Sequence, residues 1–257
     1  MQNAYDVVAP SFDRHRRLPA GVPEAIRAAI LKTLSVAAPR LLDLGAGSGR
    51  IGAAFVAAGD DYVGVDLSAG MLREFAGRES AARLVQANGA QLPFRGAAFD
   101  GLLLIQVFGG LSGWRKIMSE VRRVLRPRGA LVIGRTQMPA DGMDARMKQQ
   151  LDAILEGSGH GQRRANARQD VLEWLAANAH SRDTVTAATW TATRTPRGFI
   201  DRHGGGARFA QLPESVRARA TRHLGAWAVT TFGSLTREFT EPHSFEFQIF
   251  RFENGNL

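Results

Sequence analysis

The sequence lacks the residue types on which several kinds of site depend. It contains no cysteine, which excludes disulfides, catalytic thiolates and cysteine-ligated metals. Only three of its 33 basic residues are lysines. Phosphate-loop, zinc-binding and Ser-His-Asp signatures are missing as well. We therefore predict no metal site and no covalent catalysis by a nucleophilic triad.

Long apolar runs are also missing. No stretch approaches the roughly 18 consecutive apolar residues that span a bilayer, and the first residues carry no basic-then-apolar signal pattern. We expect a cytoplasmic protein with no membrane partner. A hydrophobic content of 44% in 257 residues is enough for one sizeable core. Because no repeat or linker interrupts the chain, we predict a single domain over residues 1–257.

The most informative stretch is residues 40–50, R-L-L-D-L-G-A-G-S-G-R. A short apolar run breaks into Gly45, Gly47 and Gly49, and an alanine-rich amphipathic pattern follows. This order predicts a buried strand, a tight glycine turn and a helix. Glycines allow positive φ and let a ligand approach the backbone without meeting a Cβ. The unit is therefore a candidate nucleotide-ligand site.

A carboxylate helps to define the ligand. Residues 62–66, Y-V-G-V-D, predict a second strand that ends in Asp66, which can accept hydrogen bonds from both ribose hydroxyls of an adenosine. A dinucleotide fingerprint needs a third glycine at position 50, where Arg50 stands instead. The alternative at this point is a similar strand-turn-helix unit that binds another ligand, or none.

These two features resemble the class I S-adenosylmethionine-dependent methyltransferases, whose first motif is L-D-L-G-x-G-x-G. Three further stretches extend the resemblance to the methyltransferases of ubiquinone and menaquinone biosynthesis and their small-molecule relatives. They are Y-D-V-V-A-P-S-F-D at 5–13, N-G-A-Q-L-P-F at 88–94 and R-V-L-R-P-R-G-A-L-V-I at 123–133. The sequence departs from the family where Asn88 replaces an aspartate and Arg128 replaces a glycine.

The resemblance implies an α/β fold with a doubly wound seven-stranded sheet, mostly parallel with an antiparallel last strand, and a helical cap. It divides the chain into N-terminal cap helices (1–39), a cofactor-binding core (40–136) and cap insertions at 137–165 and 196–236. It implies S-adenosyl-L-methionine as the cofactor. The implied contacts are Gly45, Ala46, Gly47, Gly49, Asp66, Leu67, Met71, Asn88, Gly89, Ala90 and Gln106.

The acceptor side of the site carries weaker signals. Phe12, Phe108 and Trp190 are candidates to line an acceptor pocket, although such aromatics also build cores. His160 and His203 stand in glycine-rich breaks and are candidate bases, because histidine titrates near neutral pH. A methyl transfer needs a base only if the acceptor loses a proton during attack.

We expect a small-molecule acceptor, and two alternatives remain open. One is an RNA methyltransferase, because residues 160–225 hold eleven arginines and only five acidic residues. Their arginines recur at helical spacing, however, as they do on a solvated helix face. The other is a non-catalytic protein that binds the cofactor for a structural or regulatory purpose.

Overall fold

The computed structural model describes residues 4–107, 113–161, 167–181 and 184–252. Phe108 lies outside these residues. The chain forms two compact units, which we describe separately. Unit 1 takes in residues 1–17, 137–164 and 189–244, and unit 2 takes in residues 18–136, 165–188 and 245–257.

Unit 2 is built on a sheet of parallel strands. Its strands are β1 (Leu41–Leu44), β2 (Tyr62–Asp66), β3 (Arg83–Gln86), β4 (Phe99–Ile105) and β5 (Leu125–Gln137), and these five pair in parallel. Every residue of β1 is buried, because helices cover both faces of the sheet. The carboxyl ends of β1, β2 and β4 therefore meet at one edge, which is where open α/β sheets bind ligands.

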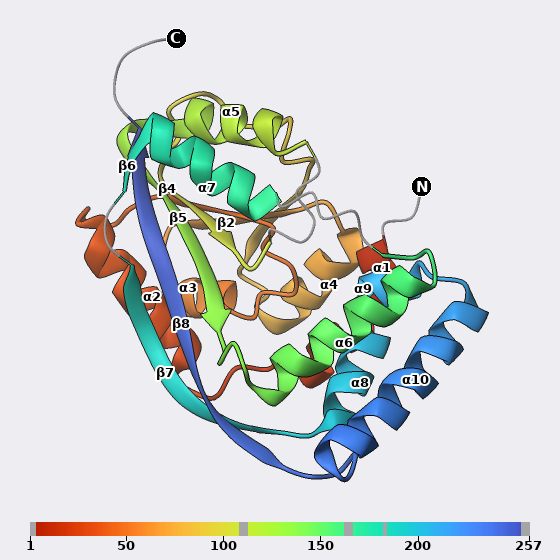
Figure 1. Cartoon of the computed structure of the whole chain (residues 1–257). Coiled ribbons are helices and arrows are strands. Elements are labelled where there is room, and N and C mark those ends of the chain that lie inside the picture. The colour runs from red at the N-terminus through yellow and green to blue at the C-terminus, as the bar shows by residue number, and fades with distance from the viewer. Residues whose placement is uncertain (1–3, 108–112, 162–166, 182–183, 253–257) are drawn as a thin grey trace. The chain divides into compact units, whose positions relative to one another are not determined.

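The C-terminal strands complete the sheet. They are β6 (Ala179–Ser181), β7 (Val185–Arg194) and β8 (Phe239–Phe252), and the order is β3-β2-β1-β4-β5-β8-β6, with β7 also beside β8 (Figure 1). β8 runs antiparallel to β6. The predicted fold class is confirmed. The described residues hold eight strands rather than seven, because the short strand β6 was not predicted and pairs with β8 as β7 does.

The helices of unit 2 follow from their apolar spacing and their caps. They are α2 (Val22–Leu34), α3 (Gly52–Ala57), α4 (Ala69–Arg78), α5 (Trp114–Val124) and α7 (Ala167–Asn178). In α2, buried residues recur every four positions from Val22 to Leu34, so one stripe faces the sheet. The N-terminus of α4 is capped by Ser68, whose Oγ accepts a hydrogen bond from the Met71 N–H at 3.1 Å.

Arg128 has an unusual backbone conformation. Arg128 has φ +66°, in the left-handed region that favours glycine. Its carbonyl oxygen accepts a hydrogen bond from Arg251 Nη1 at 2.9 Å. A residue with a long side chain therefore occupies a backbone conformation that favours glycine.

Unit 1 is mostly helical and has its own core. Its helices are α1 (Ala4–Phe12), η1 (Asp13–His15), α6 (Met143–Gly157), α8 (Pro196–Gly204), α9 (Ala207–Ala210) and α10 (Glu214–Phe232) (Figure 1). Buried residues repeat every four positions along α10, from Val216 to Phe232, and pack against apolar residues of α6 and α8. The predicted cap insertions at 137–165 and 196–236 fall almost entirely within this unit.

The described helices include none that combines the length and the apolar character needed to cross a bilayer.

Candidate functional site

The glycine loop, residues 45–50, leaves the carboxyl end of β1 and turns back over the end of β2. Gly45, Gly47 and Gly49 all have positive φ, at +84°, +57° and +77°. The N–H groups of Gly45 and Ala46 donate to the Val65 carbonyl oxygen at 2.8 and 3.0 Å. The predicted strand-turn-helix unit is confirmed, and its loop is fixed to the neighbouring strand.

The three glycines are required for different reasons. A Cβ on Gly45 would lie 2.3 Å from Val107 Cγ1, and one on Gly49 would lie 2.3 Å from the Phe75 ring. A Cβ on Gly47 would meet nothing closer than the Gly45 carbonyl oxygen, at 3.9 Å. Packing therefore excludes side chains at the first and third glycines. At Gly47 the space is open, so a ligand can reach the backbone there.

Asp66 ends β2 and joins the glycine loop to α4. Its Oδ2 accepts a hydrogen bond from the Gly47 N–H at 2.9 Å, and its Oδ1 accepts one from the Ser68 N–H at 2.8 Å. The two carboxylate oxygens thus accept backbone hydrogen bonds at the end of β2, one from the glycine loop and one from the N-cap of α4. Leu67 beside it is 56% exposed, whereas Met71 is buried.

The turn after β3 lies against the end of β1. A Cβ on Gly89 would be 3.2 Å from Leu44 Cδ1. Asn88 is exposed, and its Oδ1 accepts a hydrogen bond from the Ala90 N–H at 2.9 Å. The Asn88 oxygen that we expected to face an adenine amino group thus also closes the local turn.

Gln106 follows β4 and has φ +59°, a strained conformation for a residue with a side chain. Its Oε1 accepts from Arg50 Nη2 at 3.0 Å, and its Nε2 donates to Thr136 Oγ1 at 2.8 Å. Arg50 and Thr136 were not among the predicted contacts. Arg50 directly follows the third glycine, and Thr136 comes three residues after the motif at 123–133, so sequence position could have indicated both.

A buried acid lies under the glycine loop, in β1. Asp43 is 4% exposed, and its Oδ2 accepts a hydrogen bond from the Tyr62 hydroxyl at 2.6 Å. Burial raises the pKa of Asp43 to about 7, and the nearby Asp66 carboxylate adds to this rise. The sequence analysis assigned Asp43 no role.

The acceptor-side candidates lie in unit 1, apart from Phe108. Phe12 packs edge-on against Tyr5 with 6.2 Å between the ring centroids, as their seven-residue spacing predicts. The Arg16 guanidinium group lies over the Phe12 ring. Trp190 packs edge-on against His243, with 5.8 Å between the ring centroids. Each of these aromatics therefore has an internal packing partner.

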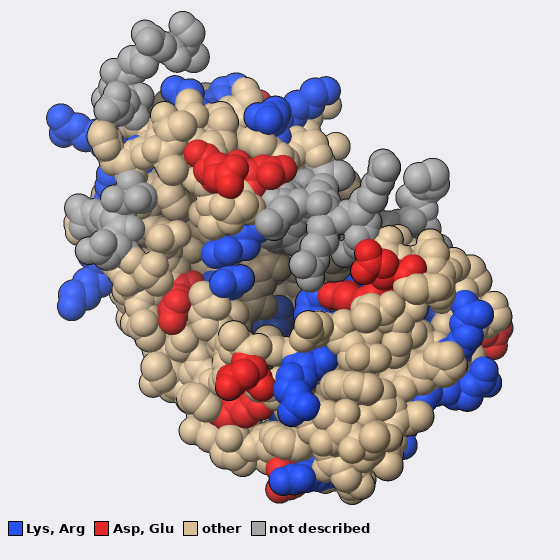
Figure 2. All heavy atoms as spheres, in the orientation of Figure 1, with Lys and Arg blue, Asp and Glu red and all other residues tan. Residues whose placement is uncertain are grey.

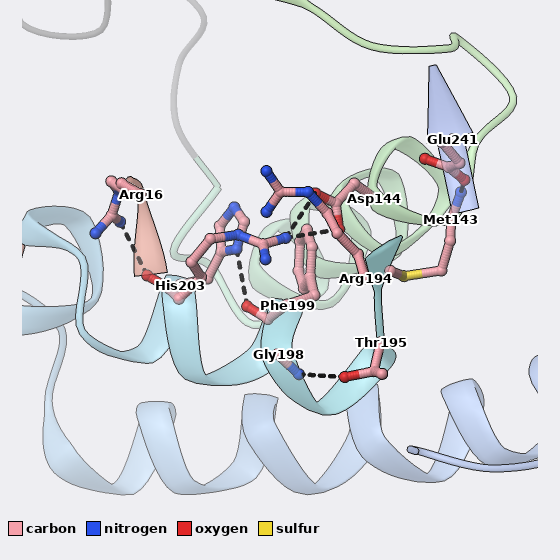
Figure 3. Close-up of polar contacts among 10 residues, drawn as sticks. Arg16, Met143, Asp144, Arg194, Thr195, Gly198, Phe199, His203 and Glu241 are labelled. Atoms are coloured by element: carbon pink, nitrogen blue, oxygen red, sulfur yellow. Dashed lines mark hydrogen bonds and ion pairs between the residues drawn. The ribbon is translucent and has the colours of Figure 1, made fainter. Parts of the chain in front are cut away.

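Each of the two candidate bases forms a hydrogen bond to a nearby backbone carbonyl oxygen at the end of a helix. His160 Nδ1 lies 2.8 Å from the Ser158 carbonyl oxygen. His203 Nδ1 lies 3.0 Å from the Phe199 carbonyl oxygen, and its ring stacks on Phe199 (Figure 3). Burial lowers the pKa of His203 to about 4, so this ring is neutral near pH 7.

A buried ionic cluster lies beside His203 in unit 1. Arg202 Nη2 donates to both carboxylate oxygens of Asp144 at 2.6 Å, and Arg194 Nε lies 3.6 Å from Asp144 Oδ2 (Figure 3). Arg16 Nη2 donates to the Arg202 carbonyl oxygen at 2.9 Å. No single sequence motif contains these residues, because they come from four separate elements.

Comparison with known proteins identifies the unit 2 site. Residues 42–133, which include the glycine loop, Asp66, Asn88 and Gln106, match the family model described as "Methyltransferase domain". The chain is 35% identical over 135 residues to a demethylmenaquinone methyltransferase of Clavibacter sepedonicus, covering 50% of this chain and 55% of the relative. Residues 42–133 are therefore similar to a methyltransferase domain, and about half of the chain is similar to demethylmenaquinone methyltransferases.

A second methyltransferase relative covers a similar share of the chain. The demethylmenaquinone methyltransferase of Thermus thermophilus is 30% identical over 146 residues, covering 54% of this chain and 66% of the relative. This chain spans a little over half the length of the curated methyltransferases that it matches.

Solved structures share the methyltransferase fold. The YcgJ protein of Bacillus subtilis has a TM-score of 0.57 at 21% identity, covering 90% of this chain and 99% of that one. The [4+2]-cyclase SpnF has a TM-score of 0.51 at 18% identity, covering 91% of this chain and 82% of that one. Since a cyclase shares the fold, the fold by itself does not fix the reaction.

Proposed function

We propose that the protein transfers a methyl group from S-adenosylmethionine to a small-molecule acceptor. The observation that carries this proposal is the pairing of Gly47 with Asp66. Backbone that is open to a ligand is held 2.9 Å from a carboxylate at the edge where β1 and β2 end. The family match over residues 42–133 supports the same conclusion.

The described residues offer a suitable group for each part of the cofactor. In our proposal, the backbone of the glycine loop (Gly45, Ala46, Gly47, Gly49) lies along the methionyl part. The Asp66 carboxylate accepts the ribose hydroxyls. The exposed Leu67 side chain and Met71 bound the adenine ring, whose edge meets Asn88, Gly89 and Ala90. Gln106, fixed by Arg50 and Thr136, borders the site from the end of β4.

The protein's own contribution is positioning. When bound, S-adenosylmethionine supplies a methyl group already activated on a sulfonium. The protein residues must then hold the acceptor in line and keep water out. A base is needed only for an acceptor that loses a proton, and His160 and His203 remain the candidates that the sequence predicts.

A small molecule is the acceptor class that we propose. On the face of the molecule drawn in Figure 2, basic side chains lie among acidic and neutral ones. The relatives named above are themselves demethylmenaquinone methyltransferases, whose acceptor is a small molecule. We therefore rank RNA second as an acceptor, and a non-catalytic cofactor-binding role third.

Calorimetry and a transfer assay test the proposal together. The full chain should bind S-adenosylmethionine and its demethylated product with micromolar-range affinity and should not bind NAD. Methyl-labelled cofactor should label small molecules of a metabolite extract but not tRNA. NAD binding without S-adenosylmethionine binding would overturn the cofactor assignment. Labelled tRNA, with steeply salt-dependent binding, would establish the RNA alternative. Cofactor binding with no labelling of either would favour the non-catalytic role.

A further inference from the structure

Three side chains of unit 2 join the glycine loop to the ends of two strands. Arg50 is the last residue of the loop, Gln106 follows β4, and Thr136 stands near the end of β5. Arg50 Nη2 donates to Gln106 Oε1 at 3.0 Å, and Gln106 Nε2 donates to Thr136 Oγ1 at 2.8 Å. We call these three residues the amide bridge, because the Gln106 amide forms both hydrogen bonds.

Arg50 fixes the direction of both hydrogen bonds in the amide bridge. A guanidinium group only donates hydrogen bonds, so the Gln106 atom that faces it must be the amide oxygen. The amide nitrogen then lies against the Thr136 hydroxyl oxygen, which accepts. If the amide were turned over, its NH₂ group would face the guanidinium group and that bond would be lost. Arg50 therefore selects one of the two orientations of the amide.

The amide bridge belongs to a residue whose backbone conformation is unfavourable by itself. Gln106 has φ +59°, in the left-handed region that favours glycine. Residues keep such conformations only where the surrounding contacts impose them, and they cluster at functional sites. The Gln106 N–H donates to the Gly134 carbonyl oxygen at 2.9 Å, and the amide bridge holds the side chain. Both the backbone and the side chain of Gln106 are thus fixed.

The glycine loop is attached to the residues after β4 at both of its ends. Gly45, at the first end, packs so closely on Val107 that a Cβ would lie 2.3 Å from Val107 Cγ1. Arg50, at the last end, donates to Gln106. The open backbone of Gly47 lies between these two attachments. A glycine at position 50, which a dinucleotide fingerprint requires, has no side chain that could form the second attachment.

We propose that Arg50 is a positioning residue that sets the affinity for the amino-acid part of the cofactor, and that it acts through Gln106. This inference rests on the proposed function, in which the glycine loop lies along the methionyl part. Removal of the guanidinium group should release the Gln106 side chain and detach the last end of the loop. The ribose end, at Asp66, should change little.

Calorimetric titrations of the full chain with two probes test this role. S-adenosylhomocysteine carries the amino-acid part, whereas 5′-methylthioadenosine keeps the adenosine and the thioether but lacks that part. Arg50→Met should bind S-adenosylhomocysteine about fivefold to tenfold more weakly than the wild type, as expected for one lost charge-assisted hydrogen bond. Its affinity for 5′-methylthioadenosine should stay within about twofold of the wild type. Arg50→Lys keeps a charged donor and should recover most of the loss.

The matched control is an arginine at the opposite edge of the sheet. Arg83, at the start of β3, forms an ion pair with Asp61. Arg83→Met should bind both probes as the wild type does. Since Arg50 and Arg83 are both at least partly exposed, the melting temperatures of the two methionine variants should stay close to that of the wild type.

A double-mutant cycle separates action through Gln106 from direct contact with the cofactor. Gln106→Gly removes the amide and lets the backbone keep positive φ without strain. If Arg50 acts through Gln106, Arg50→Met should change the affinity for S-adenosylhomocysteine by less than about twofold in this background. The same loss in both backgrounds would indicate a direct bond from Arg50 to the cofactor and would overturn the proposal. Equal weakening of both probes by Arg50→Met would overturn it too.

Hydrogen exchange gives a readout that needs no cofactor. In the full chain alone, the Gln106 N–H should exchange faster in Arg50→Met than in the wild type or in Arg83→Met. Unchanged exchange would contradict the positioning of Gln106 by Arg50, even if the affinity falls. A wild type that binds neither probe would overturn the proposed function, and with it the role in affinity, whereas binding without the expected difference between the probes would overturn this inference alone.

Discussion

Two aspartates, one in each unit, are almost equally buried but have opposite surroundings. Asp43 in unit 2 is 4% exposed and receives one hydrogen bond, from the neutral Tyr62 hydroxyl. Asp144 in unit 1 is 5% exposed and receives two bonds from Arg202, with Arg194 nearby. The first carboxyl has its pKa raised to about 7, whereas the second forms part of an ion cluster.

The difference shows that burial alone does not fix the charge of an acid. A buried carboxylate without a cation shifts toward its neutral form, and one with two guanidinium groups stays paired. In unit 2 this leaves a proton-binding group under the glycine loop. In unit 1 it leaves a carboxylate that links α6 to β7 and α8 through two arginines. The predictions below test this contrast and the glycine loop above Asp43.

The largest effect is expected when Asp144 is removed. Asp144→Ala leaves Arg202 and Arg194 buried without their carboxylate, which should destabilise the protein by about 3–5 kcal/mol. Urea unfolding of the variant and the wild type at pH 7 measures the difference. The exposed neighbour Asp141 provides the control, since Asp141→Ala should change stability by less than about 0.5 kcal/mol. Equal effects of the two substitutions would show that the ion cluster contributes nothing.

Alanine substitutions at Gly49 and Gly47 should show which glycine of the loop is required for packing and which is required for ligand binding. Gly49→Ala combines a left-handed φ with a clash against Phe75 and should destabilise the protein by about 2–4 kcal/mol. Gly47→Ala meets no clash, so only the left-handed penalty of about 1–2 kcal/mol applies, while cofactor binding should fall. Gly59→Ala, at φ +77° in open space, is the control for the backbone penalty and should leave binding unchanged. If Gly47→Ala binds cofactor as well as Gly59→Ala does, the loop backbone is not the contact surface.

The stability effect expected at Asp43 depends on pH. Because folding raises the pKa of Asp43 from about 4 to about 7, its contribution is fully present below pH 4 and is lost as pH rises to 7. An asparagine at this position needs no proton. The free energy of unfolding of Asp43→Asn, relative to that of the wild type, should therefore rise by about 2–3 kcal/mol from pH 5 to pH 8. Urea unfolding at both pH values checks this. A stability difference that is the same at pH 5 and pH 8 would mean that Asp43 does not titrate in this range.

Local patterns predicted most of unit 2. An apolar run indicated β1, residues 62–66 were predicted as the second strand, and the glycine spacing located the loop. These features depend on residues close together in the chain, so one sequence is sufficient to find them. The short strand β6 was missed because its three residues, Ala179–Ser181, carry no alternation and form a strand only beside β8.

Unit 1 shows where sequence reasoning ends. Its helices were predicted from periodicity, but Asp144, Arg194 and Arg202 come together only through tertiary packing. His243 stood out less in the sequence than His160 and His203, because it lacks a glycine-rich break. Its distinguishing property, a buried ring without hydrogen bonds to described residues, is visible only in three dimensions. The roles of all these histidines in catalysis remain predictions.

The central claim is that Asp66 and the glycine loop hold S-adenosylmethionine, and a calorimetric titration of Asp66→Ala tests it most directly. The variant should bind S-adenosylmethionine about 1.5–3 kcal/mol more weakly than the wild type, because a charged acceptor of the ribose hydroxyls is lost. Asp61→Ala, just before the opposite end of β2, is the matched control and should bind as the wild type does. Undiminished affinity in Asp66→Ala would contradict the account.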